Sequence, residues 1–269
     1  MPHLVVLVNS PAPLPPAAIQ RLAELLATDA YSIRLALNRP RPVILGRPVE
    51  ANAAEQAVAA LAGYGCEAYA LDHEEMKGLA EPLRARTLEF HRDHVRFVIT
   101  DAELALSKWD NLFLLVHGRC RTRMRERETF TPRPGHMWRA TPKITESPHE
   151  SLTDKLDIYF FDGSPPVRID CDRFSFEFLG TKRGLTDGES MQVTIQAIRK
   201  LAPQSILDDG FKQFHHAGGF AGRSRRAAEV NLGPAWIAVQ TDVDDDAPRF
   251  DFYSRLSFLI HLKRAERAT

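Results

Sequence analysis

A row of alternating arginines is the feature of the sequence whose residue type and spacing most directly predict a chemistry. Within Trp109–Arg127, every second residue after His117 is an arginine. The members of this arginine row are Arg119, Arg121, Arg123, Arg125 and Arg127. A guanidinium group is a planar fork of N–H donors that matches carboxylates and phosphates. The row therefore predicts an anion-binding face, whose partner would be an acidic protein segment, a phosphorylated ligand or RNA.

A purely structural interpretation of the same row stays open. The guanidinium groups would then pair with carboxylates of their own strand, such as Glu126 and Glu128, or with carboxylates of a neighbouring strand. The candidates there are Asp157, Asp162 and Asp170. No aromatic residue stands between the arginines, which disfavours single-stranded nucleic acid, because binding sites for single strands stack bases on aromatic rings.

A glycine-rich stretch further along the chain is a second candidate anion site. Its residues are His215, His216, Gly218, Gly219, Gly222 and Arg223. Glycines let backbone N–H groups approach a phosphate, so this stretch is the basis for an alternative function, an enzyme that acts on a phosphorylated substrate. The spacing matches neither a Walker motif nor a dinucleotide fingerprint. A flexible loop is therefore the competing interpretation, and no residue is assigned a catalytic role.

Two acidic or histidine-containing stretches resemble metal sites only in part. His91–His94 has two histidines and an aspartate but no third ligand nearby. Asp242–Asp246 begins like a calcium-binding loop, but Ala247 stands where glycine is required and Tyr253 where the bidentate glutamate is required, so an acidic turn is predicted there instead. The sequence predicts no metal site and no cofactor.

The composition limits the classes of function. Lysine plus arginine and aspartate plus glutamate number 35 each in 269 residues, which argues against bulk attraction to nucleic acid or a membrane. The cysteines Cys66, Cys120 and Cys171 are odd in number and far apart, which indicates reduced thiols and a cytoplasmic location. The apolar runs are too short to span a bilayer, and the first ten residues lack the basic start of a signal peptide.

The spacing of apolar and polar residues indicates which strands and helices position the arginine row. In an extended strand, the even positions Leu112 to Met124 would form a core face, and the arginines would project from the opposite face. Further strands are predicted at Val95–Ile99 and Leu156–Phe161. A capping box over Thr186–Glu189 predicts the start of a helix that continues over Ser190–Leu201. These elements predict the α+β class.

The first 72 residues read as a compact α/β unit with the order β-α-α-β-α-β. Its elements are predicted at Leu4–Val8, from Pro15-Pro16 to Leu26, at about Tyr31–Leu37, at Val43–Leu45, at Glu50–Leu61 and at Cys66–Leu71. The stretch AYSIRLALNRPRPVILGRPVEANAAEQAVAALAGYGCEAYAL resembles the C-terminal domain of the large-subunit ribosomal stalk protein. The resemblance covers roughly residues 20–71 and implies a docking module. Arginines, including Arg34 and Arg41, stand where that family has lysines.

The central part of the chain resembles a pleckstrin-homology-like barrel in the order of its elements. The resemblance covers about residues 90–202 and implies an antiparallel barrel whose open end binds phosphoinositides or peptides and whose helix closes the other end. We therefore expect a domain at 1–72, a linker at 73–89, a barrel-like domain at 90–202 with a mobile insertion at 128–155, and a C-terminal extension at 203–269 that ends in a helix.

The function expected from these features is that of a non-catalytic cytosolic binding or adaptor protein whose arginine row takes an anionic partner. The enzyme described above is the alternative. A ribosome- or RNA-associated factor is a third hypothesis, and the sequence does not indicate an oligomeric state.

Overall fold

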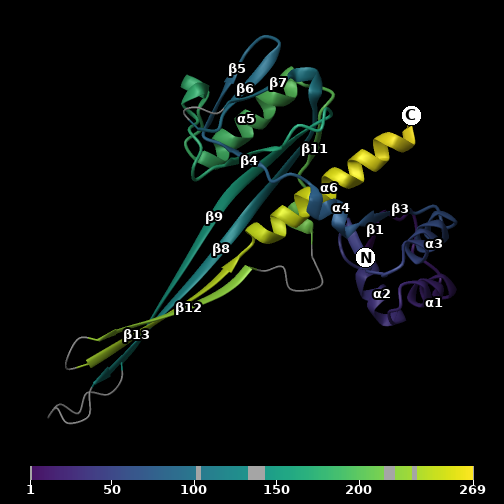
Figure 1. The fold of residues 1–269 in the computed structure, drawn as a ribbon, viewed down its shortest axis with the longest axis horizontal. Helices are drawn as coiled ribbons and strands as arrows, with labels where there is room; N and C mark the ends of the chain where they lie inside the picture. Colours follow the sequence, from purple (N-terminus) through teal and green to yellow (C-terminus); the bar gives the residue numbers. More distant parts are fainter. Residues whose placement is uncertain (1, 101–103, 133–142, 215–221, 232–234, 269) are drawn as a thin grey trace. The chain divides into compact units, whose positions relative to one another are not determined.

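The computed structural model confirms the α+β class, since helices and several sheets both occur throughout the chain (Figure 1). It describes residues 2–100, 104–132, 143–214, 222–231 and 235–268. The chain forms two compact units. Unit 1 comprises residues 1–119, 154–218 and 252–269, and unit 2 comprises residues 120–153 and 219–251.

The N-terminal part of unit 1 contains the elements that the sequence predicts, in the predicted order. Its strands are β1 (His3–Asn9), β2 (Val43–Gly46) and β3 (Glu67–Asp72), which form an antiparallel sheet in the order β2-β1-β3. Its helices are α1 (Pro16–Leu25), α2 (Ala30–Leu37), α3 (Ala51–Ala62) and α4 (His73–Gly78). Asp29 caps α2 by accepting a hydrogen bond from Ser32 N at 2.8 Å.

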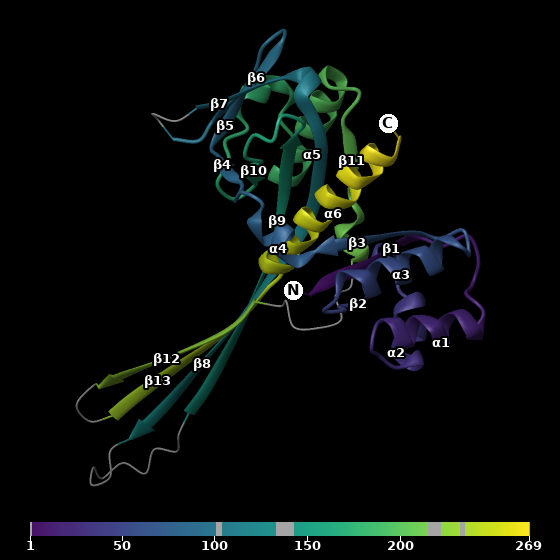
Figure 2. The same cartoon turned by 45° about the vertical axis from the view of Figure 1, so that its right-hand side comes forward.

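The apolar stripes of these helices close a core on one face of the sheet. Ile19 and Leu22 of α1, Ile33 of α2 and Leu61 of α3 are buried together with Val5 of β1. Figure 2 shows the three helices on the same side of this sheet. Helices with an apolar stripe and strands with an apolar face bury those surfaces against each other, so local pattern and tertiary packing agree here.

Seven strands form a mixed sheet. Its path is β12-β13-β8-β9-β10-β4, and β11 pairs with β8 off this path. The strands are β4 (Leu83–Ala85), β8 (Leu112–Pro132), β9 (Lys143–Phe160), β10 (Val167–Asp170), β11 (Ile206–Asp208), β12 (Gly222–Asn231) and β13 (Ala235–Asp245). The described strands follow an open path with β12 and β4 at its ends, so they do not form the closed barrel expected for residues 90–202.

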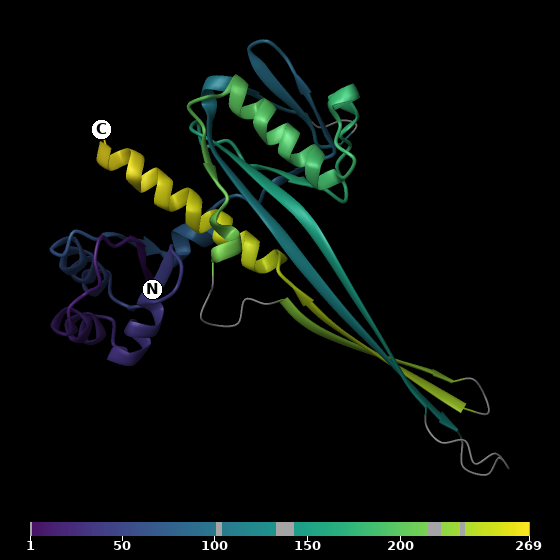
Figure 3. The same ribbon diagram turned by 180° about the vertical axis from the view of Figure 1, so that it is seen from behind.

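A second core of unit 1 lies between this sheet, a small antiparallel sheet and helix α5 (Asp187–Leu201). The small sheet consists of β5 (Thr87–Phe90), β6 (His94–Val98) and β7 (Leu104–Lys108). Figure 3 shows α5 beside these three strands. The predicted capping box is present: Thr186 Oγ1 accepts from Glu189 N at 3.1 Å, and Glu189 Oε2 accepts from Thr186 N at 3.3 Å.

Several boundaries differ from those predicted. The stretch 73–89 contains α4 and β4 and is not a bare linker. The expected mobile insertion at 128–155 includes the end of β8 and much of β9, while residues 133–142 lie outside the described residues. The C-terminal stretch 203–269 contributes β11, β12 and β13 to the central sheet and ends in α6 (Ala247–Ala268), so it is more than an extension.

Helix α6 is tied to the rest of unit 1 by a buried polar group. Arg168 on β10 donates to both carboxylate oxygens of Asp157 on β9, at 2.6 and 2.7 Å, and Ser254 on α6 donates to Asp157 Oδ2 at 2.5 Å. Asp157 is fully buried, so its charge must be compensated inside the protein. The sequence analysis had proposed Asp157 as a partner for the arginine row, and this arrangement explains why it is not one.

Candidate functional site

The arginine row lies on one uninterrupted strand, as the sequence predicts. Strand β8 runs over Leu112–Pro132, and its odd positions change from buried at Phe113 and Leu115 to exposed from Arg119 onward. The even positions are buried at Cys120 and partly buried at Met124. The alternation therefore places the arginines on the exposed face of the strand.

Within unit 2, two arginines share one carboxylate of β9. Arg123 Nε lies 3.2 Å from Glu150 Oε2, and an Arg121 guanidinium nitrogen lies 3.8 Å from Glu150 Oε1. The three side chains are 46%, 47% and 50% exposed for Arg121, Arg123 and Glu150. Water screens ion pairs that are this exposed, so each is worth about 0–1 kcal/mol.

On its other side, β8 pairs with β13, where carboxylates stand opposite arginines. The register places Asp244 opposite Arg123 and Asp242 opposite Arg125. Directly opposite residues of an antiparallel pair project from the same face, so oppositely charged groups face each other there. Gln240, opposite Arg127, donates from Nε2 to Asp242 Oδ2 at 3.0 Å. The exposed face of unit 2 thus alternates in charge from strand to strand.

The turn from β13 into α6 is fastened to β8 by hydrogen bonds within unit 2. Asp246 Oδ2 accepts from Arg121 N at 3.3 Å, and Asp246 N donates to Arg121 O at 3.0 Å. Thr122 Oγ1 donates to Asp245 Oδ1 at 3.1 Å. The predicted acidic turn at Asp242–Asp246 is therefore largely a strand, since β13 extends to Asp245.

Arg119 differs from the other members of the row, because it belongs to unit 1 and is paired with a buried carboxylate. Its Nε and one terminal nitrogen donate to Asp154 at 3.0 to 3.2 Å, and His117 Nε2 lies 3.2 Å from the same carboxylate. Burial alone would raise the pKa of Asp154, but hydrogen bonds from His117 and Arg119 outweigh it and lower that pKa. Arg119 therefore already has an anionic partner within unit 1.

The carboxylates that the sequence analysis proposed as partners serve other groups. Asp157 binds Arg168, Asp170 binds Lys155, and Asp162 accepts from Ser164 N at 2.9 Å. The partners found instead, Asp154 and Glu150, lie on β9. Glu150 and Asp154 both stand at even positions of β9, and this spacing was the signal in the sequence that they share one face of the strand. The spacing does not predict which arginines they face, because cross-strand partners depend on the register of the hairpin.

The second predicted anion site cannot be built from the described residues. His215, His216, Gly218 and Gly219 lie outside them. Gly222 and Arg223 begin β12, where they stand opposite Asp245 and Asp244 of β13. Pairing in a ladder fixes the backbone of these two residues in an extended form.

A cluster of polar side chains around Asp208 in unit 1 is not among the sites predicted from the sequence. Tyr253 donates to Asp208 Oδ1 at 2.5 Å, Ser257 donates to Oδ2, and His261 Nε2 lies 3.8 Å from Oδ2. Burial by itself would raise the pKa of Asp208, but the nearby His261 and the hydrogen bonds from Ser257 and Tyr253 lower it to about 2. The four-residue spacing of the donors along α6 was the signal in the sequence.

Within the described part of the chain, no group of three or more histidine, cysteine, aspartate or glutamate residues is arranged to hold a metal ion. At the His91–His94 stretch, the two histidine rings stack 4.4 Å apart and His94 Nδ1 lies 2.8 Å from Asp93 Oδ1.

None of the described helices is long and apolar enough to cross a membrane. No family model, curated protein or solved structure matches the chain.

Proposed function

We propose that this protein is a non-catalytic binding protein whose arginines on β8 in unit 2 bind an acidic segment of another protein. The observation that supports this most is the exposed ion-pair network in which Arg121 and Arg123 share Glu150. Because these pairs are weak and half-exposed, a partner carboxylate can replace Glu150 at little cost to the fold. The guanidinium forks would then bind the partner instead.

The charge of unit 2 favours an acidic protein segment over a nucleic acid. Its two segments hold eleven arginine and lysine residues against ten aspartate and glutamate residues. Nucleic-acid binding depends on neutralising many phosphates, and a nearly neutral unit supplies little of that attraction. A short acidic segment needs only a few well-placed guanidinium groups.

Substitution of Glu150 tests the exchange directly. Glu150→Gln should tighten the binding of poly-glutamate to the full chain about three- to tenfold, because Arg121 and Arg123 lose a competing internal partner. Isothermal titration calorimetry at a fixed salt concentration measures the change. Glu177→Gln, an exposed glutamate of unit 1, adds the same net charge and should leave the affinity unchanged.

Two outcomes would contradict the proposal. Equal affinities of wild type and Glu150→Gln would show that the arginines on β8 do not bind the probe. Tighter binding of polyuridylate than of poly-glutamate at physiological salt would instead favour the hypothesis of an RNA-associated factor.

A further inference from the structure

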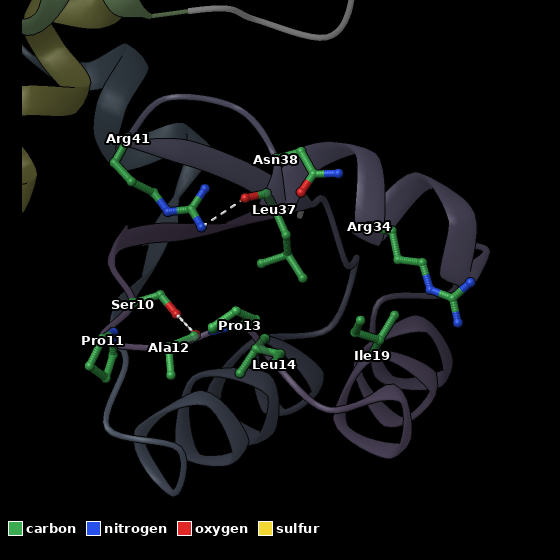
Figure 4. A pocket seen from close by; sticks show the side chains of 10 residues that line it. All are labelled: Ser10, Pro11, Ala12, Pro13, Leu14, Ile19, Arg34, Leu37, Asn38 and Arg41. Carbon is green, nitrogen blue, oxygen red and sulfur yellow. Dashed lines mark hydrogen bonds between the residues drawn. The ribbon is translucent and has the colours of Figure 1, made fainter.

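A pocket of about 420 Å³ lies entirely within the N-terminal part of unit 1 (Figure 4). Its walls come from the segment between β1 and α1 and from the end of α2. The lining residues are Ser10, Pro11, Ala12, Pro13, Leu14, Ile19, Arg34, Leu37, Asn38 and Arg41. Most of them are apolar, and the volume lies in the range of sites for small organic ligands.

Arg41 is the polar group that gives this pocket a chemical preference. Its two terminal nitrogens donate to Arg39 O at 2.9 Å and to Leu37 O at 3.0 Å, which fixes the guanidinium beside Leu37 (Figure 4). These bonds satisfy carbonyls at the end of α2 and use two of the five N–H donors. Among the described residues, no hydrogen bond of the other three donors of this positionally fixed cation is found.

The charge of Arg41 is only partly compensated. Burial lowers the pKa of Arg41, which means that its cationic form has lost hydration. Among the residues that the structure describes, no carboxylate forms an ion pair with Arg41 or with Arg34, the second arginine of the pocket. A partly desolvated cation that is held by neutral carbonyls gains from an anion.

We propose that this pocket binds a small amphiphilic organic anion, with its acidic group on Arg41 and its apolar body over Leu14, Ile19 and Leu37. Arg34 lines the opposite end of the pocket (Figure 4) and adds positive potential. The complementarity is twofold, since charge orients the ligand and the proline- and leucine-rich wall removes its apolar surface from water. This site is independent of the arginines on β8.

Ligand titrations of the full chain separate the contributions of charge and apolar body. Octanoate should raise the melting temperature and bind with a measurable affinity by calorimetry. Octan-1-ol, which has the same tail without the charge, and acetate, which has the charge without the tail, should each bind at least tenfold more weakly. Octyl phosphate in a parallel titration distinguishes a phosphate from a carboxylate as the preferred head group.

Substitutions at two lining residues test whether octanoate binds in this pocket. Arg41→Gln should weaken octanoate about tenfold or more, as expected for loss of a charged hydrogen-bond donor. Ala12→Trp places a large side chain at an exposed lining position and should abolish binding without disturbing the core. Arg21→Gln, on α1 outside the pocket, is the matched control and should bind octanoate as wild type does.

The proposal is overturned if octanoate and octan-1-ol bind equally, if neither binds at millimolar concentration, or if Ala12→Trp binds octanoate like wild type. Because Arg41 also holds two carbonyls of the α2 end, Arg41→Gln is interpreted only with an unchanged circular dichroism spectrum. Ala12→Trp decides the matter if Arg41→Gln fails to fold.

Discussion

At the scale of residues, the chain uses carboxylates in two different ways. Asp157 and Asp208 lie inside unit 1 and each accepts several hydrogen bonds, whereas Glu150 in unit 2 is half-exposed and lies 3.2 and 3.8 Å from two guanidinium groups. A buried carboxylate that loses its donors is strongly destabilising, whereas an exposed one can change partners at little cost. Under the proposed function, this contrast separates the groups that hold the fold from the groups that would be available for binding.

Asp208 makes stability depend on pH at the acidic end. Its folded pKa of about 2 lies below its ordinary value of 3.8, so its contribution is present above pH 4 and is lost as the pH falls toward 2. That shift corresponds to about 2 kcal/mol. Asp208→Asn should therefore unfold more easily than wild type at pH 7, and urea titrations should show the difference shrinking between pH 4 and pH 2.

Asp209→Asn is the matched control for this prediction. Asp209 is adjacent and exposed, so its substitution should change the free energy of unfolding by less than about 0.5 kcal/mol at any pH. A difference between wild type and Asp208→Asn that stayed constant from pH 7 to pH 2 would contradict the role assigned to the Asp208 carboxylate.

At the scale of elements, the sequence predicted correctly those features that depend only on residues close to one another in the chain. The capping box at the start of α5 and the alternation along β8 are both present in the structure. The stretch Asp242–Asp246 was predicted as an acidic turn, because aspartates disfavour strands, but β13 continues to Asp245. In the structure, Asp242 and Asp244 stand opposite Arg125 and Arg123 in the ladder of β13 and β8, and this strand pairing between segments more than 100 residues apart overrides the local preference.

The capping box makes a quantitative prediction for α5. Thr186→Ala removes the hydroxyl that accepts from Glu189 N and should lower the free energy of unfolding by about 1 kcal/mol. Thr186→Ser keeps the hydroxyl and should recover most of the loss. Chemical denaturation measures both. Equal stability of wild type and Thr186→Ala would show that the cap contributes nothing.

At the scale of the whole molecule, residues 1–72 form a recognisable part of a larger unit. One face of their sheet closes a core with α1, α2 and α3. The residues Leu4, Val6, Tyr69 and Leu71 are also buried without belonging to that core, and Arg267 of α6 stacks over the Tyr69 ring at 4.4 Å. The apolar stripes of the predicted helices indicated that they would cover the first face of the sheet. No pattern in the sequence indicated which residues cover the second face.

The isolated fragment Met1–Asp72 tests this description. It should give a dispersed NMR spectrum, because one core is complete within it, and should bind the dye ANS more strongly than the full chain, because the second face is uncovered. A disordered spectrum would contradict an independent core. A folded fragment that bound no more dye than the full chain would contradict covering of the second face by later residues.

Under the proposed function, the arginines on β8 in unit 2 bind a partner rather than hold the fold. The most direct measurement compares poly-glutamate affinity and melting temperature for two triple variants of the full chain. Arg121→Gln/Arg123→Gln/Arg125→Gln removes three arginines of the row. Arg21→Gln/Arg173→Gln/Arg183→Gln removes the same charge from exposed side chains of unit 1.

We predict that the first variant binds poly-glutamate at least tenfold more weakly than wild type and melts within a few degrees of it, since the substituted ion pairs are exposed and individually worth about 0–1 kcal/mol. The second variant should keep most of the affinity. Equal losses in both variants would show that only net charge matters. A first variant that melted far below wild type would show that the arginines hold the fold, and would contradict the account.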